Sequence, residues 1–189
     1  MISCSHPLYG YHPTEVDEPH DIEQGIINGI KNAAIRKLNH ELGIDPNKLS
    51  IDDFKYLTRL HYSASSSDQP HQSTNTFDSD DFCWGESEID YILFIKADFK
   101  IPTTKQLKDS TDMMIDIFPH PDEIDDLKYV TRTELNDMMD ENNNNSVNYQ
   151  WSPWFRIICK HFLSHWWDNI DITLNTNTYC NYKAIHKLI

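Results

Sequence analysis

Apolar residues recur with a helical period in two parts of the chain. Across residues 24–42 they fall every four positions on one face of the expected helix, at Ile30, Ala34, Leu38 and Leu42. Gly43 stands where a left-handed C-cap belongs, and Pro46 follows shortly after. The pattern therefore predicts a helix over residues 24–42 that ends at Gly43.

The second helical pattern lies near the C-terminal end. Ser152 is a good N-cap and Pro153 suits a first helical turn, so a helix is expected from there through about Trp167. Its apolar face is formed by Phe155, Ile158, Phe162 and Trp166. A shorter helix is expected over residues 133–139, and the tail after Asn169 carries weak signals.

Runs of β-branched and aromatic residues predict two strong strands, Phe54–Tyr62 and Ile89–Lys96. Residues 127–131 predict a third, short strand. Residues 9–23 are rich in turn formers and acidic groups, and residues 100–122 carry three prolines. Both of these stretches are therefore expected to be irregular.

Helices and strands alternate without dominance of either, which indicates a mixed α/β or α+β class. Residues 63–82 are rich in Ser, Asp, Gln and Thr, and residues 140–148 include four consecutive asparagines. Such low-complexity stretches are typical of expanded surface loops. Because the elements on either side cannot each build a core alone, residues 1–189 are expected to form one domain with two loop inserts.

Composition narrows the classes of function. The chain has 189 residues, 39% of them hydrophobic, which is enough for one core. The formal net charge of −14 argues against nucleic acid as a partner, and an anionic substrate would need a divalent cation to mediate its binding. No apolar run is long enough to span a bilayer, and residues 1–8 do not resemble a signal peptide. The four cysteines show no metal-finger spacing, so we expect reduced thiols, a cytoplasmic location and no membrane partner.

Two carboxylates, Glu86 and Glu88, lead directly into the second predicted strand. Because side chains alternate faces along a strand, both point the same way, and like charges this close raise each other's pKa unless a cation relieves them. The pair is a candidate metal or acid–base site, with a solvated strand end as the alternative. Cys4 and His6 likewise share a face of an extended segment. They could supply an acid or a base, or be a buried cysteine and a surface histidine.

Lys37 and Glu41 lie one turn apart at the end of the first predicted helix. They could form a simple ion pair, or Glu41 could carry Mg²⁺ to a phosphate beside a basic group. Residues 41–44, Glu-Leu-Gly-Ile, resemble the tail of a Nudix box. A Nudix hydrolase would have glutamates at positions 37 and 40, where this chain has Lys37 and His40. This counts against a Nudix hydrolase and leaves the Nudix-like fold open.

Two aromatic residues have a functional alternative to simple packing. Tyr62 ends the first predicted strand, where it could be a core aromatic or a phenol in a proton relay. Trp154 could pack in a core or offer its π face to a developing cation. Both alternatives stay open on the residues alone.

Six motifs occur in the order found in one enzyme family. They are Cys4–Leu8, Ala33–Ile44, Arg59–Tyr62, Trp84–Leu93, Ser152–Phe155 and Trp166–Asp168. In this combination, which spans nearly the whole chain, the sequence resembles the type 1 isopentenyl-diphosphate isomerases. The resemblance implies a Nudix-like mixed sheet sandwiched by helices. It also implies interconversion of isopentenyl and dimethylallyl diphosphate in isoprenoid biosynthesis, by adding a proton to one end of the alkene and removing one from the other.

The same resemblance implies roles for single residues. Cys4 and Glu88 match the family's catalytic cysteine and glutamate, and Tyr62 matches its assisting tyrosine. Which of Cys4 and Glu88 donates the proton stays open. The residues that match substrate-binding positions are Arg36, Lys37 and Trp154.

Divalent metal ions are the cofactors that the resemblance implies. A protein-bound ion, Mg²⁺ or alternatively Mn²⁺ or Zn²⁺, would have His6, Glu86 and Glu88 among its ligands. Glu41 matches the carboxylate that helps to hold Mg²⁺ on the diphosphate. The expected partner is thus a small diphosphate, bound by a monomer.

The chain departs from the family at its start. Family members have a sizeable segment before the cysteine motif, which supplies two further metal-binding histidines, basic residues for the diphosphate and part of the sheet. Here three residues precede Cys4, so we expect a fragment, a mis-started gene model or a decayed copy. The alternatives to an active isomerase are a catalytically impaired isomerase fragment and, with less support, a Nudix pyrophosphohydrolase.

Overall fold

The computed structural model describes residues 4–65, 85–100, 115–140 and 149–188. Its helices are α1 (Pro19–Glu23), α2 (Asn28–Leu42), α3 (Arg132–Met139), α4 (Pro153–Ile158), α5 (Ser164–Asp168) and α6 (Ile170–Asn175). Its strands are β1 (Phe54–Ser65), β2 (Gly85–Ile95), β3 (Phe99–Lys100), β4 (Ile115–Asp116) and β5 (Ile185–Leu188). One π-helical turn, Cys159–Leu163, joins α4 to α5, so the predicted C-terminal helix is confirmed as a nearly continuous rod.

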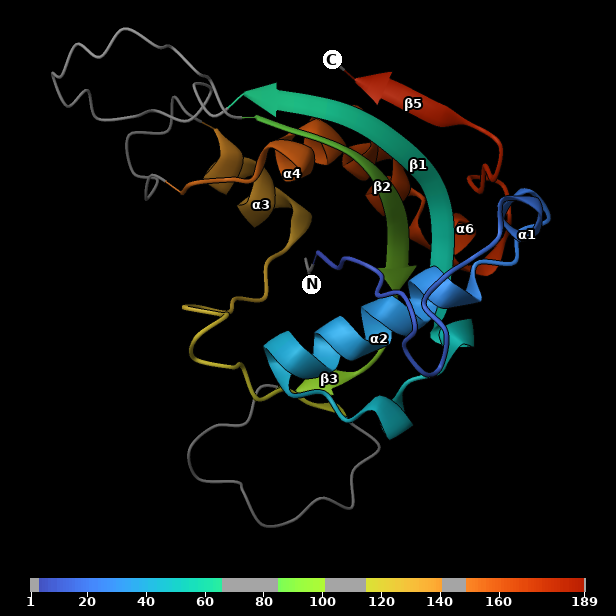
Figure 1. Ribbon diagram of the computed structural model, residues 1–189. Coiled ribbons are helices and arrows are strands. Elements are labelled where there is room, and N and C mark those ends of the chain that lie inside the picture. Colours follow the sequence, from blue (N-terminus) through green and yellow to red (C-terminus); the bar gives the residue numbers. More distant parts are fainter. Residues whose placement is uncertain (1–3, 66–84, 101–114, 141–148, 189) are drawn as a thin grey trace, which may run out of the picture.

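A mixed three-stranded sheet in the order β2-β1-β5 forms the centre of the fold. The long strands β1 and β2 pair antiparallel and arch side by side, while β5 pairs parallel to the other edge of β1 (Figure 1). The register sets Tyr62 opposite Glu88 and Leu60 opposite Asp90. Side chains of directly opposed residues lie on the same face of a sheet, so the register already groups the polar residues of the site.

Helices cover both faces of this sheet, because its strands are apolar on both sides. The core on the α2 side contains the buried residues Leu38, Leu42, Ile44, Phe54 and Ile117. The core on the α4 and α5 side contains the buried residues Leu57, Leu60, Ile92, Ile158 and Trp166. Neighbouring β2 residues take opposite sides: Leu93 packs against the first core and Ile92 belongs to the second. The arrangement is a mixed sheet between helices, and it fits an α+β, Nudix-like fold.

Helix α2 begins and ends at specific polar contacts. The carboxylate of Asp17 accepts hydrogen bonds from the backbone N–H groups of Gly29 (2.7 Å) and Ile30 (2.9 Å), which have no partner within the helix. At the other end Gly43 has a positive φ of 61°, as its predicted role as C-cap requires. The helix therefore starts four residues later than predicted and ends where the sequence placed its end.

Several local predictions need correction. Residues 127–131 form no strand; instead Thr131 caps α3, accepting from the N–H of Glu134 while the Glu134 carboxylate accepts from the N–H of Thr131. The irregular stretch 9–23 contains α1, and the stretch 100–122 contains the end of β3 and all of β4. The weak C-terminal tail holds α6 and β5. Of the two predicted inserts, residues 63–65 belong to β1, and most of both stretches falls outside the described residues.

Within residues 4–65, 85–100, 115–140 and 149–188, no helix combines the length and the apolar character that a bilayer crossing requires.

Candidate active site

A cavity of about 440 Å³ opens along β2, between the first described residues, α2 and the start of α4. This volume is in the range of small-molecule sites. Its polar lining includes Cys4, Ser5, His6, Glu88 and Asp90. Its apolar lining comes largely from α2 and β2, with Trp154 from α4. The cavity thus combines an apolar wall with a few ionisable groups.

Cys4 and His6 line the cavity from a segment that belongs to no helix or strand. The neighbouring Ser5 hydroxyl donates to the backbone carbonyl of Ala33 on α2 (3.0 Å), which ties this segment to the helix. Burial raises the pKa of the Cys4 thiol, and the negative charges of Asp90 and Glu88 raise it further. The thiol therefore holds its proton at neutral pH.

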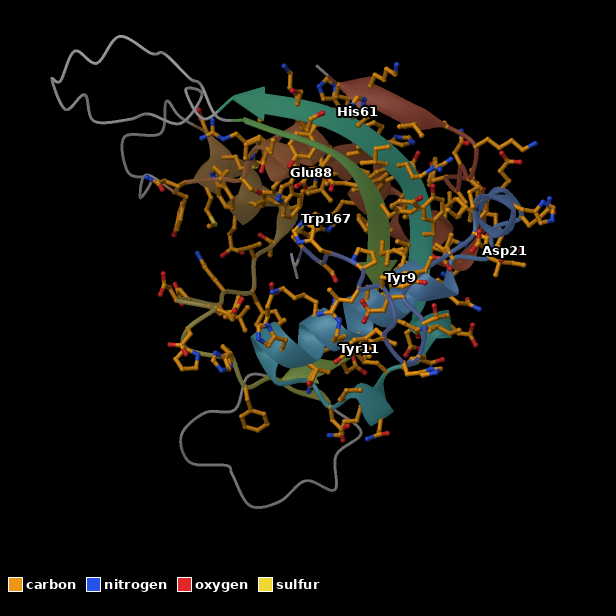
Figure 2. The ribbon with its side chains drawn as sticks, viewed as in Figure 1. Tyr9, Tyr11, Asp21, His61, Glu88 and Trp167 are labelled. Atoms are coloured by element: carbon orange, nitrogen blue, oxygen red, sulfur yellow. The ribbon has the colours of Figure 1, made fainter. Side chains whose placement is uncertain are left out.

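Strand β2 brings the carboxylates of Glu88 and Asp90 to the same cavity. Glu88 projects from β2 (Figure 2), and its Oε1 lies 3.8 Å from the Nε2 of His6. Glu86 and Asp90 share its face of the strand, because they stand two residues before and after it. The sequence prediction that Glu86 and Glu88 point to one face is confirmed by this geometry.

Tyr62 lies opposite these carboxylates on β1 and is buried, with 1% of its surface exposed. Its hydroxyl donates a hydrogen bond of 2.9 Å to Oε1 of Glu86. Burial raises the pKa of the phenol, and the bond to Glu86 and the charge of Asp90 raise it further. Tyr62 is therefore a proton-bearing group that contacts Glu86 directly.

Asp90 is a member of the site that the sequence reasoning did not select. Its carboxylate lines the cavity, and its Oδ2 atom is buried with no hydrogen-bond partner among the described residues. Burial, followed by the charges of Glu88 and Glu86, raises the pKa of Asp90 to about 6. The alternation of Glu86, Glu88 and Asp90 along β2 is the signal that could have identified it.

The charged groups at the C-terminal end of α2 form a separate network. The ammonium of Lys37 lies 3.2 Å from Oε1 of Glu41 and 3.3 Å from Oε2 of Glu123. Burial alone would lower the pKa of Lys37, but these two carboxylates outweigh it and the pKa is raised. Lys37 and Glu41 do not line the cavity, yet both charges act on the Cys4 thiol.

Arg36 lies on the same helix and has a different environment from Lys37. Its Nε donates to Oε1 of Glu15 (2.6 Å), and its Nη2 donates to the Glu15 carboxylate (3.0 Å) and to the carbonyl of His6 (2.9 Å). The guanidinium also lies 5.5 Å from the ring centre of Tyr11, which Figure 2 shows beside α2. The side chain is held by protein groups on several sides.

The predicted metal ligands have donor atoms that suit a divalent cation, but the structure brings these ligands together only in part. An imidazole and carboxylates are suitable donors for Mg²⁺, Mn²⁺ or Zn²⁺. Only His6 and Glu88 come within ion-pair distance, while Glu86 accepts from Tyr62. In the part of the chain that the structure describes, no three His, Cys, Asp or Glu side chains form a group that could hold a metal ion.

The assembled groups can carry out proton transfer next to an apolar ligand. A protonated thiol and a carboxylate line one cavity, so a proton donor and a proton acceptor are both present. Trp154 adds an aromatic face to the same wall. A ligand with an apolar chain and a proton to exchange would fit these walls.

Comparison with known proteins finds similarity to enzymes of one kind. The chain is 36% identical over 185 residues to the isopentenyl-diphosphate delta-isomerase of Gibberella zeae, covering 98% of this chain and 56% of the relative. The chain is homologous to the isopentenyl-diphosphate delta-isomerases. The enzyme of Schizosaccharomyces pombe is 36% identical over 168 residues, covering 89% of this chain and 56% of that enzyme. The chloroplastic isomerase I of Arabidopsis thaliana is 35% identical over 185 residues, covering 98% of this chain and 50% of that enzyme.

The homology covers nearly all of this chain but only part of its relatives. The chain spans about half the length of these isomerases. No protein-family model matches the sequence. The proteins that are named isomerases in these comparisons come from fungi, plants and Dictyostelium discoideum, so the similarity is not confined to one lineage.

Proposed function

We propose that this chain interconverts isopentenyl diphosphate and dimethylallyl diphosphate. The observation that carries the proposal is the cavity that holds Cys4 and Glu88 together within a mostly apolar wall. Homology to isomerases over 98% of the chain supports the same reaction. The reaction moves a double bond by one position, so it needs one proton added to the alkene and one removed.

Cys4 and Glu88 are the groups to which we assign the two proton transfers. The raised pKa of Cys4 keeps it in the thiol form, which suits a proton donor, and the Glu88 carboxylate suits a proton acceptor. Tyr62 assists through the hydrogen bond to Glu86, which fixes that carboxylate next to the site. Trp154 offers its π face to the positive charge that develops on the substrate.

The proposal also assigns residues to the diphosphate of the substrate and to divalent metal ions. A divalent cation, when bound, would neutralise charge on the diphosphate and among the carboxylates, with His6, Glu86 and Glu88 as ligands at the protein site and Glu41 at the diphosphate. Lys37 is the basic residue that this assignment gives to the diphosphate, while Arg36, which also matches a substrate-binding position, is held by Glu15 and by the carbonyl of His6. Lys37 would have to exchange its contacts with Glu41 and Glu123 for contacts with phosphate.

The mixed sheet with helices on both faces supports a Nudix-like fold for this chain. Pyrophosphate hydrolysis is not favoured, because Lys37 and His40 stand where a hydrolase would have glutamates. Action as a monomer is part of the same proposal.

The proposal is tested by following dimethylallyl diphosphate formation. The purified 189-residue chain is supplied with Mg²⁺ and isopentenyl diphosphate. We expect conversion, and we expect Cys4→Ser and Glu88→Gln each to lower kcat by about 100-fold or more, as for the loss of a general acid or base. Cys159→Ser, which changes a half-buried thiol outside the cavity, should leave kcat within about twofold.

Three outcomes would contradict the proposal. If Cys159→Ser and Cys4→Ser lowered kcat equally, the thiol in the cavity would have no special role. If the folded chain released phosphate from nucleoside diphosphates and left isopentenyl diphosphate unchanged, it would be a pyrophosphohydrolase. A folded chain that is inactive, beside an active form extended upstream, would identify an impaired isomerase.

A further inference from the structure

The segment that carries Cys4 and His6 has no regular secondary structure, so other contacts must fix it. One of these is the bond from the Ser5 hydroxyl to the Ala33 carbonyl (3.0 Å). The backbone N–H of Leu8 donates to Oε2 of Glu15 (2.8 Å), and the carbonyl of His6 accepts from Nη2 of Arg36 (2.9 Å). Two of these three contacts depend on the Glu15–Arg36 pair.

Glu15 is a buried carboxylate with an unusually complete set of partners. Only 1% of its surface is exposed. It accepts from the Nε of Arg36 at 2.6 Å, from the Nη2 of Arg36 at 3.0 Å and from the N–H of Leu8. A buried charge is tolerated only when it is paired and hydrogen-bonded, and the two-pronged contact with Arg36 also fixes its orientation.

The backbone around Glu15 is itself fixed on α2. A Cβ atom at Gly29 would lie 2.7 Å from the carbonyl carbons of both Glu15 and Val16, so the loop packs directly on the helix there. Two residues later, Asp17 accepts from the N–H groups at the start of α2. The backbone at Glu15 is therefore held firmly on α2, so its side chain can fix the segment that carries Cys4 and His6.

Arg36 connects Glu15 to the segment that carries Cys4 and His6. Its Nε and Nη2 groups are engaged by Glu15 and by the His6 carbonyl, and Arg36 does not line the cavity. We propose that Glu15 and Arg36 are positioning residues that fix Cys4 and His6 opposite Glu88. The inference rests on the proposed isomerase activity, because the position of the Cys4 thiol matters only if the thiol transfers a proton.

The expected effect is on the proton-transfer step and not on substrate affinity. A thiol displaced by about 1 Å from its reacting carbon can lower the rate by up to about 100-fold. Glu15→Gln keeps the shape of the side chain but removes the charge that holds Arg36. We expect kcat to fall about tenfold or more, with KM changed by less than about twofold. The exposed Glu23 of α1 provides the matched control, and Glu23→Gln should change neither value.

A second readout does not depend on isomerase activity. The alkylation rates of Cys4 and Cys159 by iodoacetamide are compared by peptide mapping in the folded chain without substrate. Glu15→Gln should speed alkylation of Cys4 by about threefold or more, because its segment opens locally, and leave Cys159 unchanged. Arg36→Lys, which keeps the charge and loses the two-pronged contact, should act in the same direction and more weakly.

The outcomes separate this inference from the proposed function. A wild-type chain without isomerase activity would contradict the function, while the alkylation rates would still decide the role of Glu15. Unchanged alkylation of Cys4 in Glu15→Gln, or an equal rise at Cys4 and Cys159, would overturn the positioning role.

If the variants do not fold, a measurement on the wild-type chain still tests the proposal. Hydrogen exchange of the Leu8 amide should be at least about tenfold slower than that of Tyr9, because the Leu8 N–H donates to the buried Glu15. Equal exchange rates at Leu8 and Tyr9 would overturn the proposal.

Discussion

At the scale of single residues, one feature of the site could be predicted from the sequence and two could not. Strand alternation was enough to place Glu86 and Glu88 on one face. The burial of the Asp90 Oδ2 atom depends on packing between segments far apart in the sequence, which no local pattern reports. The pairing of Glu15 with Arg36 joins residues 21 positions apart through an irregular loop, so no helical or strand period could indicate it.

The Glu15 carboxylate should make stability depend on pH. Burial alone would raise its pKa, but the bonds from Arg36 and the Leu8 N–H outweigh burial, so the pKa lies below the ordinary value of 4.5. The folded state therefore binds fewer protons than the unfolded state between these two pKa values. The stabilisation is complete above the unfolded pKa and is lost as the pH falls through the folded pKa.

Urea unfolding of wild type and Glu15→Gln at several pH values checks this dependence. The difference in the free energy of unfolding should be largest at about pH 7 and should shrink as the pH falls below 4.5. A difference that stays constant across this range would show that the carboxylate's ionisation does not stabilise the fold.

At the scale of elements, length decided which predictions held. The long periodic segments that became α2, β1, β2 and the α4–α5 rod were confirmed, because many residues carry the same pattern. The missed elements α1, α6, β3, β4 and β5 contain six residues or fewer, and β5 is defined by its pairing with β1. The short strand at residues 127–131 was wrong because β-type composition there ends in Thr131, whose hydroxyl caps α3.

The C-cap of α2 should tolerate only glycine. Gly43 has a φ of 61°, and a Cβ atom there would lie 2.6 Å from the carbonyl oxygen of Phe118. Gly10 has a φ of 75° with nothing within 4 Å, so it isolates the cost of the left-handed conformation. We expect Gly10→Ala to lower the free energy of unfolding by about 1 kcal/mol and Gly43→Ala by about 2 kcal/mol or more. Equal losses in urea unfolding would argue against the steric contact.

At the scale of the whole molecule, β1 joins the two cores. Phe54 at its start belongs to the core under α2, and Leu60 further along belongs to the core under α4 and α5. The cavity lies where these two layers meet along β2, so its apolar wall follows from the fold. The alternation of helices and strands predicted this class of fold, while the size and position of the cavity required the packed structure. That residues 1–189 form one domain stays a prediction.

The cavity and the homology both support the proposed reaction, which is the movement of a double bond by paired proton transfers. In D₂O this reaction has a signature that no hydrolysis reproduces. The proton added to the terminal carbon of isopentenyl diphosphate comes from exchangeable hydrogen, so it should appear as deuterium in a methyl group of the product. The proton lost from the carbon next to the diphosphate-bearing one passes to the solvent.

Proton and deuterium NMR of the folded chain in D₂O with Mg²⁺ and isopentenyl diphosphate is the most direct measurement. We predict dimethylallyl diphosphate with deuterium in a methyl group, and no such product with Cys4→Ser or Glu88→Gln. Isopentenyl diphosphate that stays unlabelled and unconverted, with the chain folded and Mg²⁺ present, would contradict the account.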